Sequence, residues 1–292
     1  MPRTPALTAL VVAAVLVVAG CSDDGDAGSS TTPPAVAPTA PTDRALVEVL
    51  DAGSGDRRAL ALDVDADTSQ EVSLVLEQEL VADEAVTRVP AISFAMTSVV
   101  TAVGDDEVAT EQTFGEPGLA GDRLSESDAA AVRAQLGTLT GTTSQLVVRR
   151  DGTTVRAADG VPAAAQPDSL LRLLVPVLPT GEVGVGSTWT ATTVVLVDGA
   201  LVDQVATYTL SSLEGDDYVV EVTAEQQYRP GDVGGTEVRS GRGTVTATLT
   251  GSLRSVVPTE ASATVSSQVV YVVAGAASEL RSTLALDLSA GG

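Results

Sequence analysis

Residues 244–288 read TVTATLTGSLRSVVPTEASATVSSQVVYVVAGAASELRSTLALDL, and apolar and polar side chains alternate along three successive parts of this stretch. In the first part, Val245, Ala247 and Leu249 share one side, while threonines occupy the other. Because successive side chains of a β-strand point to opposite faces, this period of two is typical of an antiparallel sheet with one face on a core. The stretch therefore predicts three consecutive antiparallel strands.

The same alternation marks residues 71–82 and 218–228. Strands of roughly 11 to 13 residues would be about 35 to 45 Å long, which exceeds the usual length. Asp151-Gly152 and Asp198-Gly199 predict tight two-residue hairpin turns. We therefore predict a mainly β (α+β) fold built on a large curved antiparallel sheet or half β-barrel, with a two-lobed β-sandwich as the alternative.

One or two short helices are expected beside the strands. Residues 125–128, Ser-Glu-Ser-Asp, resemble a capping box, and Ala129, Val132 and Leu136 fall on one stripe after it. A second short helix is predicted over residues 168–174, because Pro176 cannot continue it.

The N-terminus has the pattern of an export signal. After a short basic start, residues 6–19 are apolar apart from Thr8, and these 14 residues are fewer than the roughly 18 to 20 of a membrane-spanning helix. We predict a signal peptide over residues 1–20. An ordinary cleaved signal with an incidental cysteine, or an uncleaved anchor, is the alternative.

Cys21 is the only cysteine of the chain, and it follows the small residues Ala19 and Gly20. This arrangement resembles the lipobox of bacterial lipoproteins, which implies a diacylglycerol on the Cys21 thiol and cleavage before Cys21. The resemblance places the chain at the extracytoplasmic face of the cell membrane, attached to the membrane through that lipid. Several acyl chains give durable attachment, because each buried methylene contributes about 0.8 kcal/mol.

Residues 21–43 are rich in Ser, Thr, Pro and Gly without apolar periodicity, which predicts a disordered tether that could carry O-glycans. Residues 44–292 are long enough for one β-rich domain, or for two lobes at 44–178 and 179–292.

The net charge of the chain and its missing residue types exclude several partners and chemistries. Its formal net charge is −23, from 39 acidic residues against 16 basic ones, so phosphate backbones should repel it and nucleic-acid binding is not expected. His and Lys are absent, which rules out a Ser-His-Asp triad, imidazole metal sites and Schiff-base lysines. We expect no cofactor, no enzyme activity and a monomer.

Three acidic groups are candidate sites. Asp63, Asp65 and Asp67 have the spacing of a calcium loop, but Thr68 and Leu74 stand where glycine and a closing glutamate belong, so a solvated stripe on a strand is preferred. Residues 105–107 and 122–128 could supply paired carboxylates for glycoside hydrolysis, although turns and a helix cap also account for them.

Trp189, the only tryptophan, follows a glycine-rich segment that begins at Pro179. We interpret it as a core aromatic residue, with ligand stacking as the alternative. The loop with Val-Gly-x-Gly-x-x-Trp over residues 183–189 resembles a segment of secreted actinobacterial lipoproteins. The lipobox, tether and long strands also resemble the layout of mycobacterial LppX/LprG-type lipoproteins and LolA-type carriers, which implies a half β-barrel that holds acyl chains on its concave face.

The sequence therefore favours an envelope lipoprotein that binds or carries a lipid or another hydrophobic ligand. Its inward positions are mostly Ala, Val and Leu, which a broad curved sheet cannot easily fill from its own side chains. The alternatives are a structural or interaction module that docks an envelope protein and, third, a carboxylate-based hydrolase.

Overall fold

The computed structural model describes residues 44–82, 85–120, 125–155, 171–197, 199–273 and 275–291. Cys21, the predicted signal peptide and the predicted tether lie outside the described residues. None of the helices among these residues is long and apolar enough to cross a bilayer.

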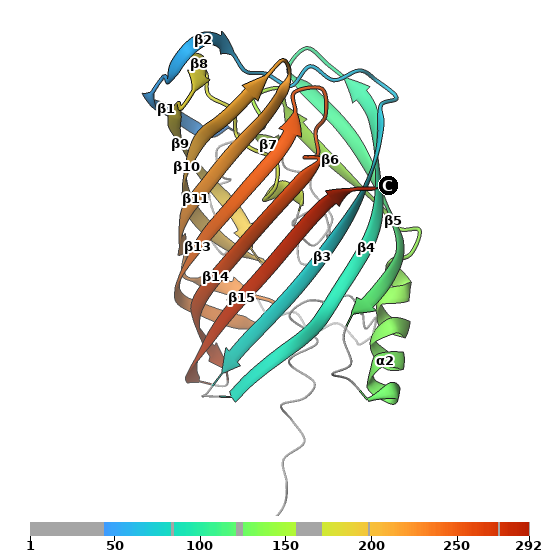
Figure 1. Cartoon of the computed structure of the whole chain (residues 1–292). Coiled ribbons are helices and arrows are strands. Elements are labelled where there is room, and N and C mark those ends of the chain that lie inside the picture. The colour runs from blue at the N-terminus through green and yellow to red at the C-terminus, as the bar shows by residue number, and fades with distance from the viewer. Residues whose placement is uncertain are drawn as a thin grey trace, which may run out of the picture.

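The described residues form a 13-stranded antiparallel sheet that curves around an interior but does not close (Figure 1). Its order is β1-β9-β10-β11-β13-β14-β15-β3-β4-β5-β6-β7, and β12 pairs with β13. The predicted mainly β fold with a large curved antiparallel sheet is confirmed. The strands of this sheet are β1 (Leu46–Asp51), β3 (Ser69–Ala82), β4 (Ala85–Val103), β5 (Glu107–Ala120), β6 (Thr143–Arg149), β7 (Thr154–Val155), β9 (Thr188–Val197), β10 (Ala200–Glu214), β11 (Asp217–Tyr228), β12 (Gly231–Val233), β13 (Thr236–Ser252), β14 (Glu260–Val273) and β15 (Ala276–Ala290).

Strands from both halves of the chain share this sheet, because β15 pairs with β3 over a register that includes Leu286 opposite Leu76. A small second sheet joins β2 (Ser54–Ala59) to β8 (Glu182–Val185) above one end of the large one (Figure 1). The large sheet therefore has β1 and β7 as its edge strands.

The α-helix α2 (Glu126–Leu136) lies beside β5 (Figure 1). It begins directly after Ser125, as predicted, and the Ala129 N–H donates to the Ser125 carbonyl at 2.9 Å. It continues into the 3₁₀ helix η1 (Gly137–Leu139). Of the second predicted helix, residues 168–170 lie outside the described residues. Leu171 and Arg172 are helical, and the Leu174 N–H donates to the Leu171 carbonyl at 2.9 Å in the turn that follows.

A hairpin does join β6 to β7 at the predicted Asp151-Gly152, but its turn is longer than the predicted two residues, because Val148 lies opposite Thr154 and the Arg149 N–H donates to the Thr153 carbonyl at 2.8 Å. Gly152 has a φ of +78°, which L side chains rarely adopt, and its N–H donates to the Arg149 carbonyl at 2.9 Å. A Cβ at this position would also collide with the Pro176 carbonyl oxygen. Glycine is therefore required here both by the turn and by the segment packed against it.

Three connecting segments fill one end of the curved sheet, the upper end in Figure 1. They contribute Leu60, Leu62 and Val64 before β3, Leu171 to Leu178 before β8, and Leu253, Val256 and Val257 after β13 to the main hydrophobic core. We call this the filled end. Its apolar side chains pack against the inward residues of the strands, and this burial is the dominant favourable contribution to folding.

Candidate binding site on the concave face

The strand register decides which side chains point into the curve. On one cross-strand row, Trp189 lies opposite Tyr208, Tyr208 opposite Val222, and Val222 opposite Ala247. Residues two positions along each strand share this face. On the described parts of β3, β9–β11 and β13–β15, every inward position is an uncharged residue, so the acidic residues of these strands lie on the outer face or at strand ends.

At the filled end, the interior is closed by aromatic packing and a hydrogen bond. The rings of Trp189 and Tyr208 stack with centroids 5.5 Å apart, and Trp189 Nε1–H donates to the Val177 carbonyl at 2.8 Å. Burial raises the pKa of Tyr208 to about 12, so its hydroxyl stays neutral. The interpretation of Trp189 as a core aromatic residue is confirmed.

A second buried feature of the filled end is a set of hydrogen-bonded polar side chains around Gln112. Gln112 Nε2 donates to Thr110 Oγ1 at 2.6 Å and approaches Ser98 Oγ at 3.5 Å, while Thr110 Oγ1 donates to the Leu146 carbonyl at 3.2 Å. Ser144 Oγ lies 3.5 Å from Gln112 Oε1. These polar side chains supply one another with partners, as buried polar groups generally do.

Farther from the filled end, a row of polar and small residues crosses the concave face. Each member lies opposite the next across neighbouring strands, and Gln78 of β3 joins the row by donating from Nε2 to Ser282 Oγ at 3.3 Å. We call this set the polar row: Thr193, Gln204, Gln226, Gly243, Ser267 and Ser282, with Gln78.

The polar row contains buried atoms that have no hydrogen-bond partner. Five such side-chain atoms occur among the described residues, and three of them belong to the row: Thr193 Oγ1, Gln226 Oε1 and Gln78 Oε1. Gln226 is only 4% exposed, and its Nε2 donates to Gln204 Oε1 at 2.8 Å. An unpaired buried polar atom costs about 1–3 kcal/mol, so such a cluster calls for a partner.

Gly243 provides the space that Gln226 occupies. A Cβ at Gly243 would lie 2.6 Å from Gln226 Oε1 and 3.1 Å from the Ser266 carbonyl oxygen. Any larger residue at this position would displace the glutamine side chain. The sheet therefore makes room for a polar side chain at a place where valine or leucine would otherwise continue the core.

Beyond the polar row lies a second apolar cluster, separate from the main core. Val202 and Val269 are among its buried members, one register row from Gln204 and Ser267. Every member lies on a strand of the sheet, and no connecting segment among the described residues contributes to it. Its buried members are Ala200, Val202, Tyr228, Val238 and Val269, with Val195, Val197, Val233 and Tyr271 packed against them.

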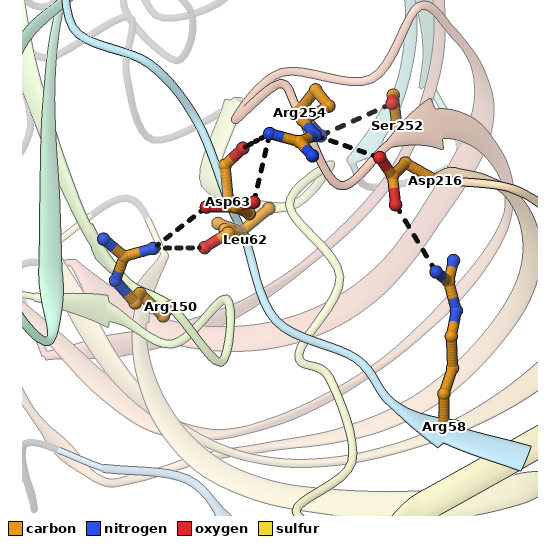
Figure 2. A network of polar contacts seen from close by, with 7 residues as sticks. All are labelled: Arg58, Leu62, Asp63, Arg150, Asp216, Ser252 and Arg254. Carbon is orange, nitrogen blue, oxygen red and sulfur yellow. Dashed lines mark hydrogen bonds and ion pairs between the residues drawn. The ribbon is translucent and has the colours of Figure 1, made fainter.

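Figure 2 shows how charged residues tie the turns together at the filled end. Arg254 Nε lies 2.9 Å from Asp216 Oδ2, and one of its terminal nitrogens lies 3.0 Å from Asp63 Oδ2. Arg58 also approaches Asp216, at 3.4 Å, and Arg150 donates to the Leu62 carbonyl at 2.9 Å. We call these residues the rim network. Hydrogen bonding to Arg254 lowers the pKa of Asp216.

The predicted acidic sites fall mainly on this rim. The sequence predicted that Asp63, Asp65 and Asp67 lie on a strand, and this prediction is wrong. They lie in the connection between β2 and β3, where Leu62 and Val64 point inward and the aspartates point outward. Asp106 pairs with Arg44 at 2.6 Å and Arg149 at 3.0 Å. The described residues contain no group of three or more potential metal-ligating side chains.

Two other predicted features cannot be placed. Asp122 and the lipidation candidate Cys21 lie outside the described residues, so both remain predictions. The polar row itself was missed by sequence analysis. Its signal was present, because Gln226 interrupts the apolar side of its strand between Ala224 and Tyr228, and Ser267 does so between Val265 and Val269.

No protein-family model and no curated protein matches the chain. Among solved structures, the COG4313 outer membrane channel from Pseudomonas putida F1 is 10% identical in sequence. The comparison covers 79% of this chain and 98% of the channel, with a TM-score of 0.20. A TM-score this low does not establish a shared fold.

Proposed function

We propose that this chain is a lipid-anchored extracytoplasmic protein that binds a hydrophobic ligand on the concave face of its sheet. The observation that carries the proposal is the second apolar cluster. Its residues are inward-facing and apolar, and its buried members are at most 7% exposed, yet no connecting segment among the described residues packs on them as segments do at the filled end. Apolar concave surfaces with a few placed polar groups are typical of sites for small hydrophobic molecules.

The proposed anchor is the lipid on Cys21. A thiol after Ala19-Gly20 at the end of an apolar run supports it, and 22 residues separate Cys21 from Arg44. If largely extended at about 3.1 Å per residue, this length would hold the sheet as much as roughly 70 Å from the bilayer. The net charge of −23 favours such separation, because anionic lipids repel an acidic surface.

Ligand binding is tested with the full chain produced in a lipoprotein-processing host. Native mass spectrometry should detect a co-purified lipid, and the delipidated protein should take up a fluorescent fatty-acyl probe. Ala224→Phe should reduce uptake at least about tenfold by placing a ring on the concave face. Thr223→Phe, one residue earlier on the outer face, should leave uptake unchanged. A lipid-free protein that takes up no probe would refute this function.

Lipidation is tested separately by growing the host with an alkyne-tagged fatty acid. The wild-type chain should carry the tag and partition into detergent, whereas Cys21→Ser should lose both properties. Tagging that persists in Cys21→Ser, or a wild-type chain without the tag, would contradict the proposed anchor.

A second candidate function is docking of an envelope protein along the edge strand β1. Leu46 and Leu50 on this strand are 76% and 58% exposed. An edge strand also leaves backbone groups free to pair with another chain. Cross-linking from β1 in intact cells should capture a partner, and Leu46→Arg should abolish the capture while leaving lipid uptake intact.

A further inference from the structure

We propose that the polar row binds the uncharged head of an amphiphilic lipid that carries at least two hydroxyl groups, with the acyl chain against the second apolar cluster. This inference deepens the ligand binding proposed above and rests on it. It concerns which class of lipid the site accepts.

The unpaired atoms define the head chemically. Gln226 Oε1 and Gln78 Oε1 are carbonyl oxygens, which can only accept hydrogen bonds. The third atom, Thr193 Oγ1, belongs to a hydroxyl that can donate or accept. A ligand head that satisfies either glutamine must therefore bring an O–H or N–H donor. An ester carbonyl alone offers none.

The lack of charged residues on the inward face disfavours a charged lipid head. The inward positions of the described parts of β3, β9–β11 and β13–β15 include no Arg, Asp or Glu, so neither an anionic nor a cationic head would meet a counter-ion there. An unpaired charge in such surroundings is strongly disfavoured. The two acceptor oxygens would in addition repel a carboxylate or phosphate.

The spacing of the strands favours a head with more than one hydroxyl. Thr193 and Gln226 lie on β9 and β11, with β10 between them. Neighbouring strands are about 4.8 Å apart, so two intervals place these side chains about 10 Å apart along the sheet. A glycerol or sugar head can span such a distance with separate hydroxyls, and a single alcohol group cannot.

The position of the ligand's acyl chain follows from the strand register. Val202, Tyr228 and Val269 lie one row beyond Gln204, Gln226 and Ser267 on the same inward face. A head held at the polar row therefore has apolar surface beside it in the direction away from the filled end. In the other direction, Ala191, Ala206 and Ala224 lead to the packed core.

The test is competition against a fluorescent acyl probe, using the delipidated full chain and three competitors with the same oleoyl chain: monooleoylglycerol, methyl oleate and oleate. Monooleoylglycerol should displace the probe at concentrations at least about tenfold lower than methyl oleate, a ratio equivalent to about 1.4 kcal/mol. Oleate should compete no better than methyl oleate.

Gln226→Met should remove the preference, bringing monooleoylglycerol to within about twofold of methyl oleate. Gln227→Met is the matched control, because Gln227 lies on the outer face, where its Nε2 donates to the Gly241 carbonyl at 2.9 Å. This control should keep the wild-type preference. Unchanged binding of methyl oleate shows that Gln226→Met is folded, and Thr193→Val provides a second, smaller change with the same expected loss.

The outcomes separate the two proposals. Equal competition by monooleoylglycerol and methyl oleate, or stronger competition by oleate, would overturn the assignment of the head while leaving hydrophobic ligand binding intact. A preference that survives both Gln226→Met and Thr193→Val would also overturn it. If no competitor or probe binds, the proposed function fails as well.

Discussion

The two ends of the concave face differ in what packs on their strands and in how their unpaired polar atoms are arranged. At the filled end, connecting segments cover the strands, and the Gln112 amide is bonded to Thr110. At the polar row, Gln226 has one bonded and one unpaired amide atom, and the apolar cluster beyond it consists of sheet residues. Thr153 Oγ1 and Ser187 Oγ are also unpaired near the filled end, but the polar row brings three unpaired atoms together in one cross-strand set. Unpaired buried groups persist where function requires them.

This comparison predicts that the largest single loss of stability comes from the filled end. Trp189→Ala should lower the free energy of unfolding by about 3–5 kcal/mol, because it removes a buried ring and leaves the Val177 carbonyl without its donor. Val269→Ala, in the second apolar cluster, should cost only about 1–2 kcal/mol. Urea unfolding of both delipidated variants measures the difference, and equal losses would break the distinction between the two ends.

A somewhat smaller effect is expected where the Asp151-Gly152 turn meets the covering segment. Gly152→Ala should destabilise the chain by about 2–4 kcal/mol, because a left-handed backbone and a collision with the Pro176 carbonyl oxygen act together. Gly141→Ala provides the control, since Gly141 has a φ of +73° with open space around it. It should cost about 1–2 kcal/mol. Thermal unfolding that ranks the two variants equally would contradict a tightly packed turn.

The two buried glutamines should differ in how much stability the same substitution costs. Gln112→Met should destabilise the delipidated protein by about 1–3 kcal/mol, because Thr110 and Ser98 lose their partner. Gln226→Met removes an unpaired oxygen along with one hydrogen bond, so it should change stability by less than about 1 kcal/mol. Chemical denaturation measures both values. A large loss in Gln226→Met would mean that the polar row stabilises the empty fold.

The smallest expected effect is the pH response of the rim network. The pKa of Asp216 is lowered from 3.8, so its pairing with Arg254 stabilises the folded chain above that value and the contribution disappears as pH falls through the lower folded pKa. The pair is exposed, so high salt should screen it. Asp216→Asn should weaken the acid dependence of the melting temperature. An unchanged profile below pH of about 4 would show that the pair contributes nothing.

Much of the sheet was predictable because its signals are local. Alternation located β3, β11 and β13–β15, and Asp151-Gly152 located a hairpin, since each depends on residues adjacent in sequence. The aspartates around Leu62 and Val64 were wrongly predicted to lie on a strand. The connection crosses the core edge and buries every second residue without strand pairing, so the same period of two arises.

The polar row could not be recognised from one strand at a time. Gln226, Ser267 and Ser282 each look like an isolated interruption of an apolar pattern. They become one feature only when the register places them opposite one another through Gly243. Strand order depends on pairing between distant segments, which alternation does not specify.

The pairing of β15 with β3 also governs how the chain can fold. Leu286 and Leu76 are 210 residues apart, so β15 is synthesised long after β3. Until it arrives, β3 has an unpaired edge and the sheet cannot be joined. Contacts this distant in sequence are associated with slow folding and with aggregation of exposed strand edges. Production of this protein should therefore depend on folding factors, and truncation of β15 should direct the chain to proteolysis.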